Sequence, residues 1–119
     1  AVKNILELEA YEKRLIDRFG PLPKEAVSLL NSVRIKWKAK QIGLERLILK
    51  QNKMVGYFIG DQQSNFYQSN RFMHVMKFAQ QNGNLCKVKE KETKNGLRLL
   101  ITFENVKSIN KALELIEMI

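Results

Sequence analysis

Residues 15–27 read Leu-Ile-Asp-Arg-Phe-Gly-Pro-Leu-Pro-Lys-Glu-Ala-Val, a sequence typical of a sharp elbow between two helices. Gly20 can adopt the left-handed conformation that ends a helix, and Pro21 cannot continue the helical hydrogen-bond ladder. Pro23 presets the backbone for the first turn of a new helix, and Glu25 lies near the positive end of that helix. We therefore predict an αα-hairpin that turns at this elbow.

Helical periodicity extends on both sides of the elbow. Before it, apolar residues at a 3.6-residue period predict a helix over residues 2–18. Its apolar stripe consists of Ile5, Leu8, Leu15, Ile16 and Phe19. After the elbow, a second helix should run from Pro23 until Gly43 ends it. Its buried stripe is predicted to be Ala26, Leu30, Val33 and Trp37.

Beyond Gly43 the apolar pattern changes to short runs and strict alternation, which is typical of strands. We expect strands over residues 44–49, 54–59, 86–91 and 97–104, and helices over residues 68–81 and from Ser108 onward. Gln51-Asn52 and Asn95-Gly96 are the predicted hairpin turns. The element order is therefore α-α-β-β-α-β-β-α.

This order predicts an α+β fold, in which an N-terminal αα-hairpin precedes a β-β-α-β-β-α unit with a mainly antiparallel sheet packed by helices. No linker rich in Ser, Gly or Pro divides the chain, so residues 1–119 should form a single domain. Residue 1 is Ala and a helical pattern follows at once, so we expect a fragment of a longer protein. Residues 55–59 could form an uncovered sheet edge that pairs with a second chain.

The composition limits the classes of function. Lys and Arg number 21 against 12 Asp and Glu, a net charge of +9, which favours polyanions, acidic proteins or anionic membranes as partners. No segment approaches the roughly 18 apolar residues of a membrane span, so no membrane segment is expected. Cys86 is the only cysteine and His74 the only histidine. They exclude an internal disulfide and a four-ligand zinc site, and a reducing compartment fits best.

Signatures of catalysis are missing from the sequence. We find no Gly-rich phosphate loop ending in Lys-Ser/Thr, no dinucleotide fingerprint and no two-histidine metal helix. An enzyme would have to use His74 or Asp61, which no motif joins. Lys87, Lys89 and Lys91 share one strand face, to which Arg98 could add across the hairpin, and this row could meet phosphates or an acidic protein. A solvated lysine row that protects a sheet edge is the alternative interpretation.

The elbow also carries a family resemblance. Leu15-Ile16-Asp17-Arg18-Phe19-Gly20-Pro21-Leu22-Pro23 and Lys40-Gln41-Ile42-Gly43-Leu44 resemble two motifs of the C-terminal (TRCF) domain of the bacterial transcription-repair coupling factor. Those motifs read Leu-x-Asp-Arg-Phe-Gly-x-x-Pro and Lys-x-x-Gly-Ile. The match is specific over residues 15–49, with Leu44 in place of Ile. Beyond residue 49, only the order of helices and strands resembles the family.

The resemblance implies a terminal regulatory module of a large, cytoplasmic, bacterial DNA translocase. The parent's motor domains would use ATP and Mg²⁺ to push stalled RNA polymerase off damaged DNA, whereas this fragment would carry no cofactor, metal or catalytic role. The domain would pack against the parent's own repair-recruiting module as an autoinhibitory clamp. It would thereby restrain the motor and the recruitment of the excision-repair damage-recognition ATPase, and would meet DNA through the parent.

Two sets of residues follow as candidate sites. Those that match the family motif, and that serve the elbow or an interface, are Asp17, Arg18, Phe19, Gly20 and Pro23. The candidate interface charges are Arg14, Arg18, Arg34, Lys38, Lys87, Lys89 and Arg98. A basic nucleic-acid-binding module remains the alternative function, and a small enzyme ranks last.

Overall fold

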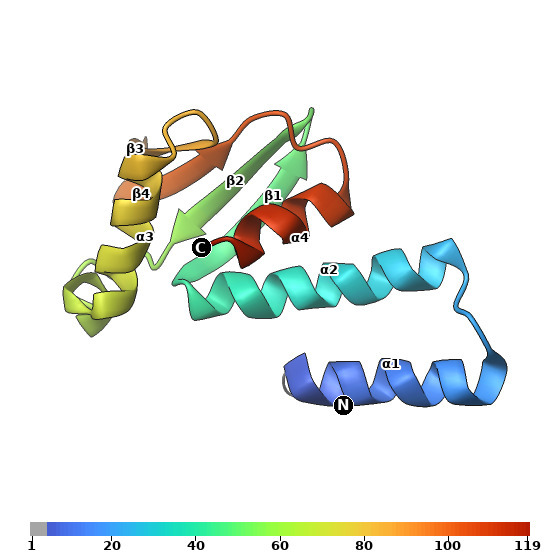
Figure 1. Cartoon of the computed structure of the whole chain (residues 1–119). Helices are drawn as coiled ribbons and strands as arrows, with labels where there is room; N and C mark the ends of the chain where they lie inside the picture. The colour runs from blue at the N-terminus through green and yellow to red at the C-terminus, as the bar shows by residue number, and fades with distance from the viewer. Residues whose placement is uncertain (1–4) are drawn as a thin grey trace.

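The computed structural model describes residues 5–119, so the predicted helix start at residue 2 lies outside the described residues. Helices α1 (Ile5–Phe19) and α2 (Lys24–Gln41) form the hairpin, as Figure 1 shows. The elements that follow are β1 (Leu44–Lys50), β2 (Lys53–Phe58), the 3-10 helix η1 (Asn65–Gln68), α3 (Asn70–Gln81), β3 (Cys86–Thr93), β4 (Gly96–Phe103) and α4 (Ile109–Glu117). The predicted α+β fold and the order of its helices and strands are confirmed.

The four strands form one antiparallel sheet in the order β1-β2-β4-β3. Gln51 and Asn52 connect β1 to β2 with φ values of 52° and 62°, as a type I′ hairpin turn requires. Strand β2 pairs with β1 on one side and with β4 on the other. The prediction that residues 55–59 form an uncovered edge was therefore wrong, because β4 returns from the far end of the chain to pair with β2. The edge strands are β1 and β3.

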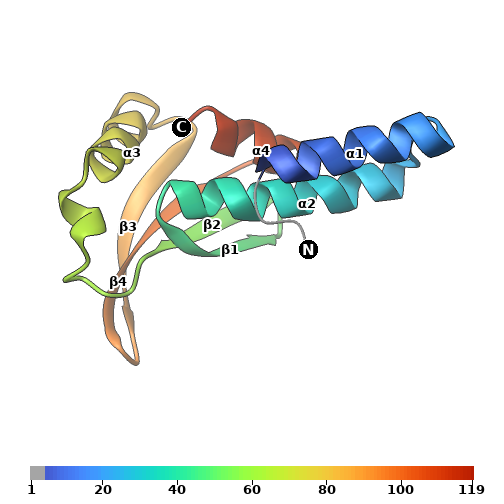
Figure 2. The ribbon, with the colours of Figure 1, turned by 90° about the horizontal axis from the view of Figure 1, so that it is seen from below.

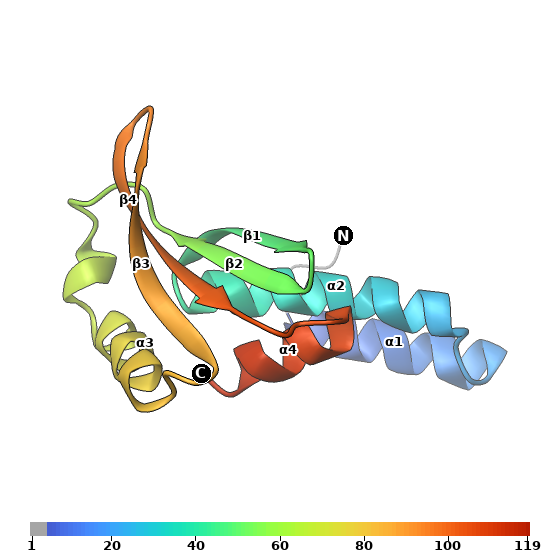
Figure 3. The same cartoon turned by 90° about the horizontal axis from the view of Figure 1, so that it is seen from above.

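Helices cover one face of the sheet and leave the other open. In Figure 3 the strands lie in front of α1 and α2, so the open face points toward the viewer. The covered face contributes Met54, Phe58, Ile101 and Phe103, each with no exposed surface. Val75 of α3, the buried face of α4, and Ile35 and Ala39 of α2 pack on it in the same core. None of the described helices has the length and apolar character of a membrane span.

The helical hairpin extends beyond the sheet as an arm, which Figure 2 shows from below. The molecule measures 48 × 29 × 29 Å along its principal axes. Helix α1 packs on α2 and buries Leu8, whereas Ile16 is 41% and Phe19 is 69% exposed. The predicted apolar stripe of α1 is thus wrong at its C-terminal end, because α2 is the main element it packs on and covers only part of it.

The buried face of α2 also differs from the prediction. Leu30, Asn31, Ile35 and Ala39 are buried, whereas Ala26, Val33 and Trp37 are only partly covered. Helix α2 contacts α1, α4 and β1, so it is covered on two sides. A single apolar stripe read from spacing could not separate these two sides.

Candidate functional site

The elbow is formed by Gly20 and Pro23. Gly20 has a φ of +82°, and its backbone N–H donates to the carbonyl of Ile16 (2.8 Å). Pro23 occupies the N-cap position of α2 in an extended conformation, and its carbonyl accepts from the N–H of Val27 (3.1 Å). The left-handed glycine and the proline therefore turn the chain as the sequence predicts.

The other members of the family motif lie on the surface instead of packing inside the elbow. Asp17, Arg18 and Phe19 are exposed, and the guanidinium of Arg18 lies over the Phe19 ring, 5.3 Å from its centroid. Together with residues one and two turns earlier on α1, they line a hollow of about 540 Å³. We call this region the arm surface, and it consists of Tyr11, Arg14, Leu15, Asp17, Arg18 and Phe19.

Arg34 is placed differently from the other candidate charges. It forms an ion pair with Glu12 of α1 and donates to the side chain of Asn31 (2.6 Å). Asn31 in turn donates to Asn110 of α4 (2.8 Å). Arg34 and Asn31 together therefore join three helices. Glu12 lies 22 positions from Arg34 and Asn110 lies 79 positions from Asn31, so no local sequence pattern predicted these contacts. Lys38 lies one helical turn further along α2 and is partly exposed.

The strand candidates gather on the open face of the sheet. The register pairs Lys91 with Arg98, which confirms that these two side chains share one face. The register also adds Arg46 and Lys50 of β1 and Lys53 of β2 to this face, none of which the sequence predicted. The spacing of Arg46 and Lys50 within one strand could have indicated that these two share a face. We call the result the basic sheet face, and it consists of Arg46, Lys50, Lys53, Lys87, Lys89, Lys91 and Arg98.

Arg98 is the most constrained residue of the basic sheet face. Its guanidinium donates to the carbonyl of Phe58 (2.7 Å) and lies 3.8 Å from the carboxylate of Glu45. It also lies over the Tyr57 ring, 5.6 Å from the centroid, while Arg46 lies 5.8 Å from the same centroid. Arg98 thus joins β4 to β2, so it is the cation of this face least available to a ligand.

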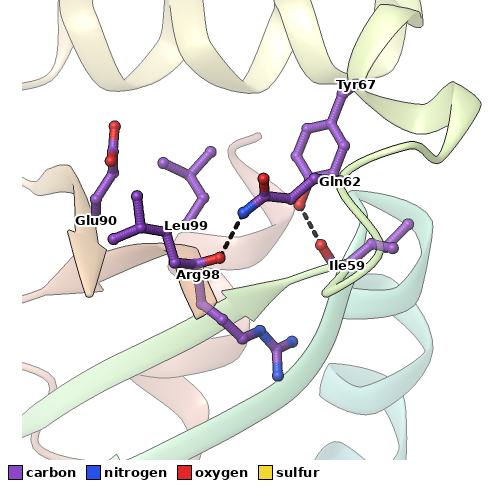
Figure 4. Close-up of a pocket in the computed structure, with 7 residues that line it drawn as sticks. Ile59, Gln62, Tyr67, Glu90, Arg98 and Leu99 are labelled. Carbon is purple, nitrogen blue, oxygen red and sulfur yellow. Dashed lines mark hydrogen bonds between the residues drawn. The ribbon is translucent and has the colours of Figure 1, made fainter. Parts of the chain in front are cut away.

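A pocket of about 280 Å³ lies on the opposite side of the β3–β4 hairpin. Figure 4 shows Tyr67 and Gln62 on one side of it, with Glu90 and Leu99 on the other, and the Arg98 side chain pointing away from Glu90. The Tyr67 hydroxyl donates to the carbonyl of Ile59, and Gln62 donates to the carbonyl of Leu97. Burial raises the pKa of Tyr67, an effect that the charge of Arg98 partly opposes. The Gln62 hydrogen bond fixes the segment after β2 against the hairpin, and the Tyr67 hydrogen bond joins two residues within that segment.

The residues considered for catalysis lie on different elements and differ in exposure. His74 is exposed on α3, and exposed Asp61 accepts from the backbone N–H of Gln63 (3.0 Å). Cys86 is buried on the covered face of the sheet, and burial raises the pKa of its thiol. Among residues 5–119, no group of three or more His, Cys, Asp or Glu side chains could hold a metal ion. The arm surface and the basic sheet face are therefore the candidate functional sites.

Comparisons with known proteins agree with this fold. The family model described as the TRCF domain matches residues 1–69. A crystal structure of the C-terminal domain of transcription-repair coupling factor aligns with 98% of this chain and 74% of that chain, with a TM-score of 0.57 and 20% identity. That likeness supports the fold. No curated protein matches the chain.

Proposed function

Because the chain belongs to the TRCF domain family, a non-catalytic C-terminal module of transcription-repair coupling factor, we propose that it is an autoinhibitory clamp. In this proposal the domain packs against the repair-recruiting module of its parent. While bound there, it restrains the parent's motor and covers the surface that recruits the excision-repair damage-recognition ATPase. Engagement of stalled RNA polymerase releases it.

The observation that best supports this proposal is the arm surface. Tyr11 and Phe19 are 42% and 69% exposed, and Arg14 and Arg18 stand beside them. Exposed aromatic side chains bordered by arginines are typical of protein–protein interfaces. Five of its six residues are exposed, so a partner could reach it without disturbing the fold.

The size and chemistry of the arm surface suit a contact that must release. Interfaces between domains of one chain are modest and more polar than obligate interfaces. Charged pairs at such a contact set specificity and association rate more than affinity. A pair of arginines next to two aromatic rings therefore suits a partner surface that combines carboxylates with an apolar recess.

Calorimetry on the intact parent protein tests the proposal. The affinity for the damage-recognition ATPase is compared, at matched salt, between the whole parent protein and a version from which this 119-residue domain is deleted. A clamp that covers the recruiting surface predicts at least about tenfold tighter binding after the deletion, because masking reduces the competent fraction. Equal affinity of the two proteins would refute the masking role.

A further inference from the structure

We propose that the basic sheet face binds the phosphate backbone of duplex DNA, independently of base sequence and of the clamp function. Seven basic side chains lie on this face, of which Lys53 pairs with Glu104 and Arg98 with Glu45. Within the described part of the chain, no carboxylate pairs with the others. These unpaired cations are Arg46, Lys50, Lys87, Lys89 and Lys91.

The character of the surrounding surface favours a polyphosphate over a protein partner. The large apolar side chains that are most exposed in the described chain are Leu6, Tyr11, Ile16, Phe19, Leu29, Leu49, Met73, Leu97 and Met118. The two in strands, Leu49 and Leu97, lie on the opposite sheet face, and the others lie outside the sheet. Protein interfaces centre on desolvated apolar anchors, whereas DNA interfaces are polar and strongly positive.

Tyr57 favours a duplex over a single strand. Proteins that bind single strands stack bases on exposed aromatic rings. Tyr57 is the aromatic residue of the basic sheet face, and it is partly buried with a guanidinium near its ring from each neighbouring strand. Its ring is thus engaged within the protein, and the exposed cations remain as contacts for an uninterrupted phosphate backbone.

The lysine row is accessible because it lies on the edge strand β3, where Lys87, Lys89 and Lys91 are all exposed. Strand β2 pairs only with residues 100–103 of β4, so the part of the hairpin that carries Lys91 also projects past the sheet, as Figure 3 shows. Alternate residues of a strand lie about 7 Å apart, so the row from Lys87 to Lys91 spans about 13 Å. That length corresponds to about four phosphates of one DNA strand along the duplex axis.

Fluorescence anisotropy with a labelled mixed-sequence duplex tests this proposal on the 119-residue chain. The triple variant K87Q/K89Q/K91Q is compared with K24Q/K77Q/K107Q, which removes the same charge from exposed lysines outside the sheet. Five phosphate contacts predict a slope of log affinity against log salt of about −4.5, and loss of three predicts about −2. We expect the first triple to bind at least about tenfold more weakly at low salt, and the second to bind like the unchanged chain.

Further arms make the test decisive. A K87R/K89R/K91R variant keeps the charge and should keep the affinity, and thermal unfolding of each variant verifies its fold. Equal weakening by both glutamine triples would overturn the proposal, because net charge alone would then explain binding. Tighter binding of a matched single strand, or binding of an acidic polypeptide without binding of the duplex, would also overturn it.

Discussion

Arg34 on α2 pairs with Glu12 on α1 through one guanidinium nitrogen, and its other terminal nitrogen donates to Asn31. The side chains of Arg34 and Glu12 are only 15% and 23% exposed. Asn31 extends the connection to Asn110 of α4. This hydrogen-bonded chain links the projecting arm to the body of the domain.

Replacing Arg34 by alanine should lower the free energy of unfolding by about 1–3 kcal/mol, because Glu12 and Asn31 then lose a partly buried partner. Urea unfolding measures the effect. The matched control is R14A on exposed α1 surface, for which we expect a change within about 0.5 kcal/mol. Equal effects of the two variants would show that the connection at Arg34 does not stabilise the fold.

Gly43 and Gly20 both have positive φ values, yet their substitutions should differ. A Cβ at Gly43 would overlap the ring of Phe66, whereas a Cβ at Gly20 would meet no atom within 4 Å. G20A should cost about 1–2 kcal/mol from backbone strain alone. G43A should cost more, because the ring of Phe66 must also move. Thermal or urea unfolding of the two variants checks the order, and a smaller loss for G43A would contradict it.

Stability should fall at alkaline pH in part through Cys86. Burial raises the pKa of its thiol from the ordinary value of 9.0, so the unfolded chain ionises first as the pH rises. The folded state binds more protons between the two pKa values, and its stability must decrease there. Tyr67 acts in the same direction from 10.0 upward. Urea unfolding at a series of pH values should therefore show a shallower decline for C86A, and parallel curves would exclude a contribution of the thiol.

Local features of the fold could be predicted from the sequence. The elbow depends on the backbone conformations of Gly20 and Pro23, and the last helix begins where the Ser108 hydroxyl accepts from the N–H of Lys111. Both signals lie within a few residues of the structure they determine. The alternation within residues 86–91 likewise predicted that Lys87, Lys89 and Lys91 share one face of β3.

Features that depend on distant pairing were not predictable in this way. Whether β2 is an edge or a central strand depends on β4, which lies more than 40 residues later. For the same reason, no spacing within one segment could bring Arg46 and Arg98 to the two sides of Tyr57. The exposure of Phe19 likewise follows from how much of α1 is covered by α2.

The clamp proposal is tested most directly by disabling the arm surface in the intact parent protein. The variant R14E/R18E/F19A keeps the whole chain and changes only exposed side chains. The control K77E/K107E reverses the same number of charges away from the arm. Calorimetry with the damage-recognition ATPase should find that the arm variant binds at least about tenfold tighter than the unchanged parent, while the control does not. An arm variant that binds no tighter than the unchanged parent would contradict a clamp that acts through this surface.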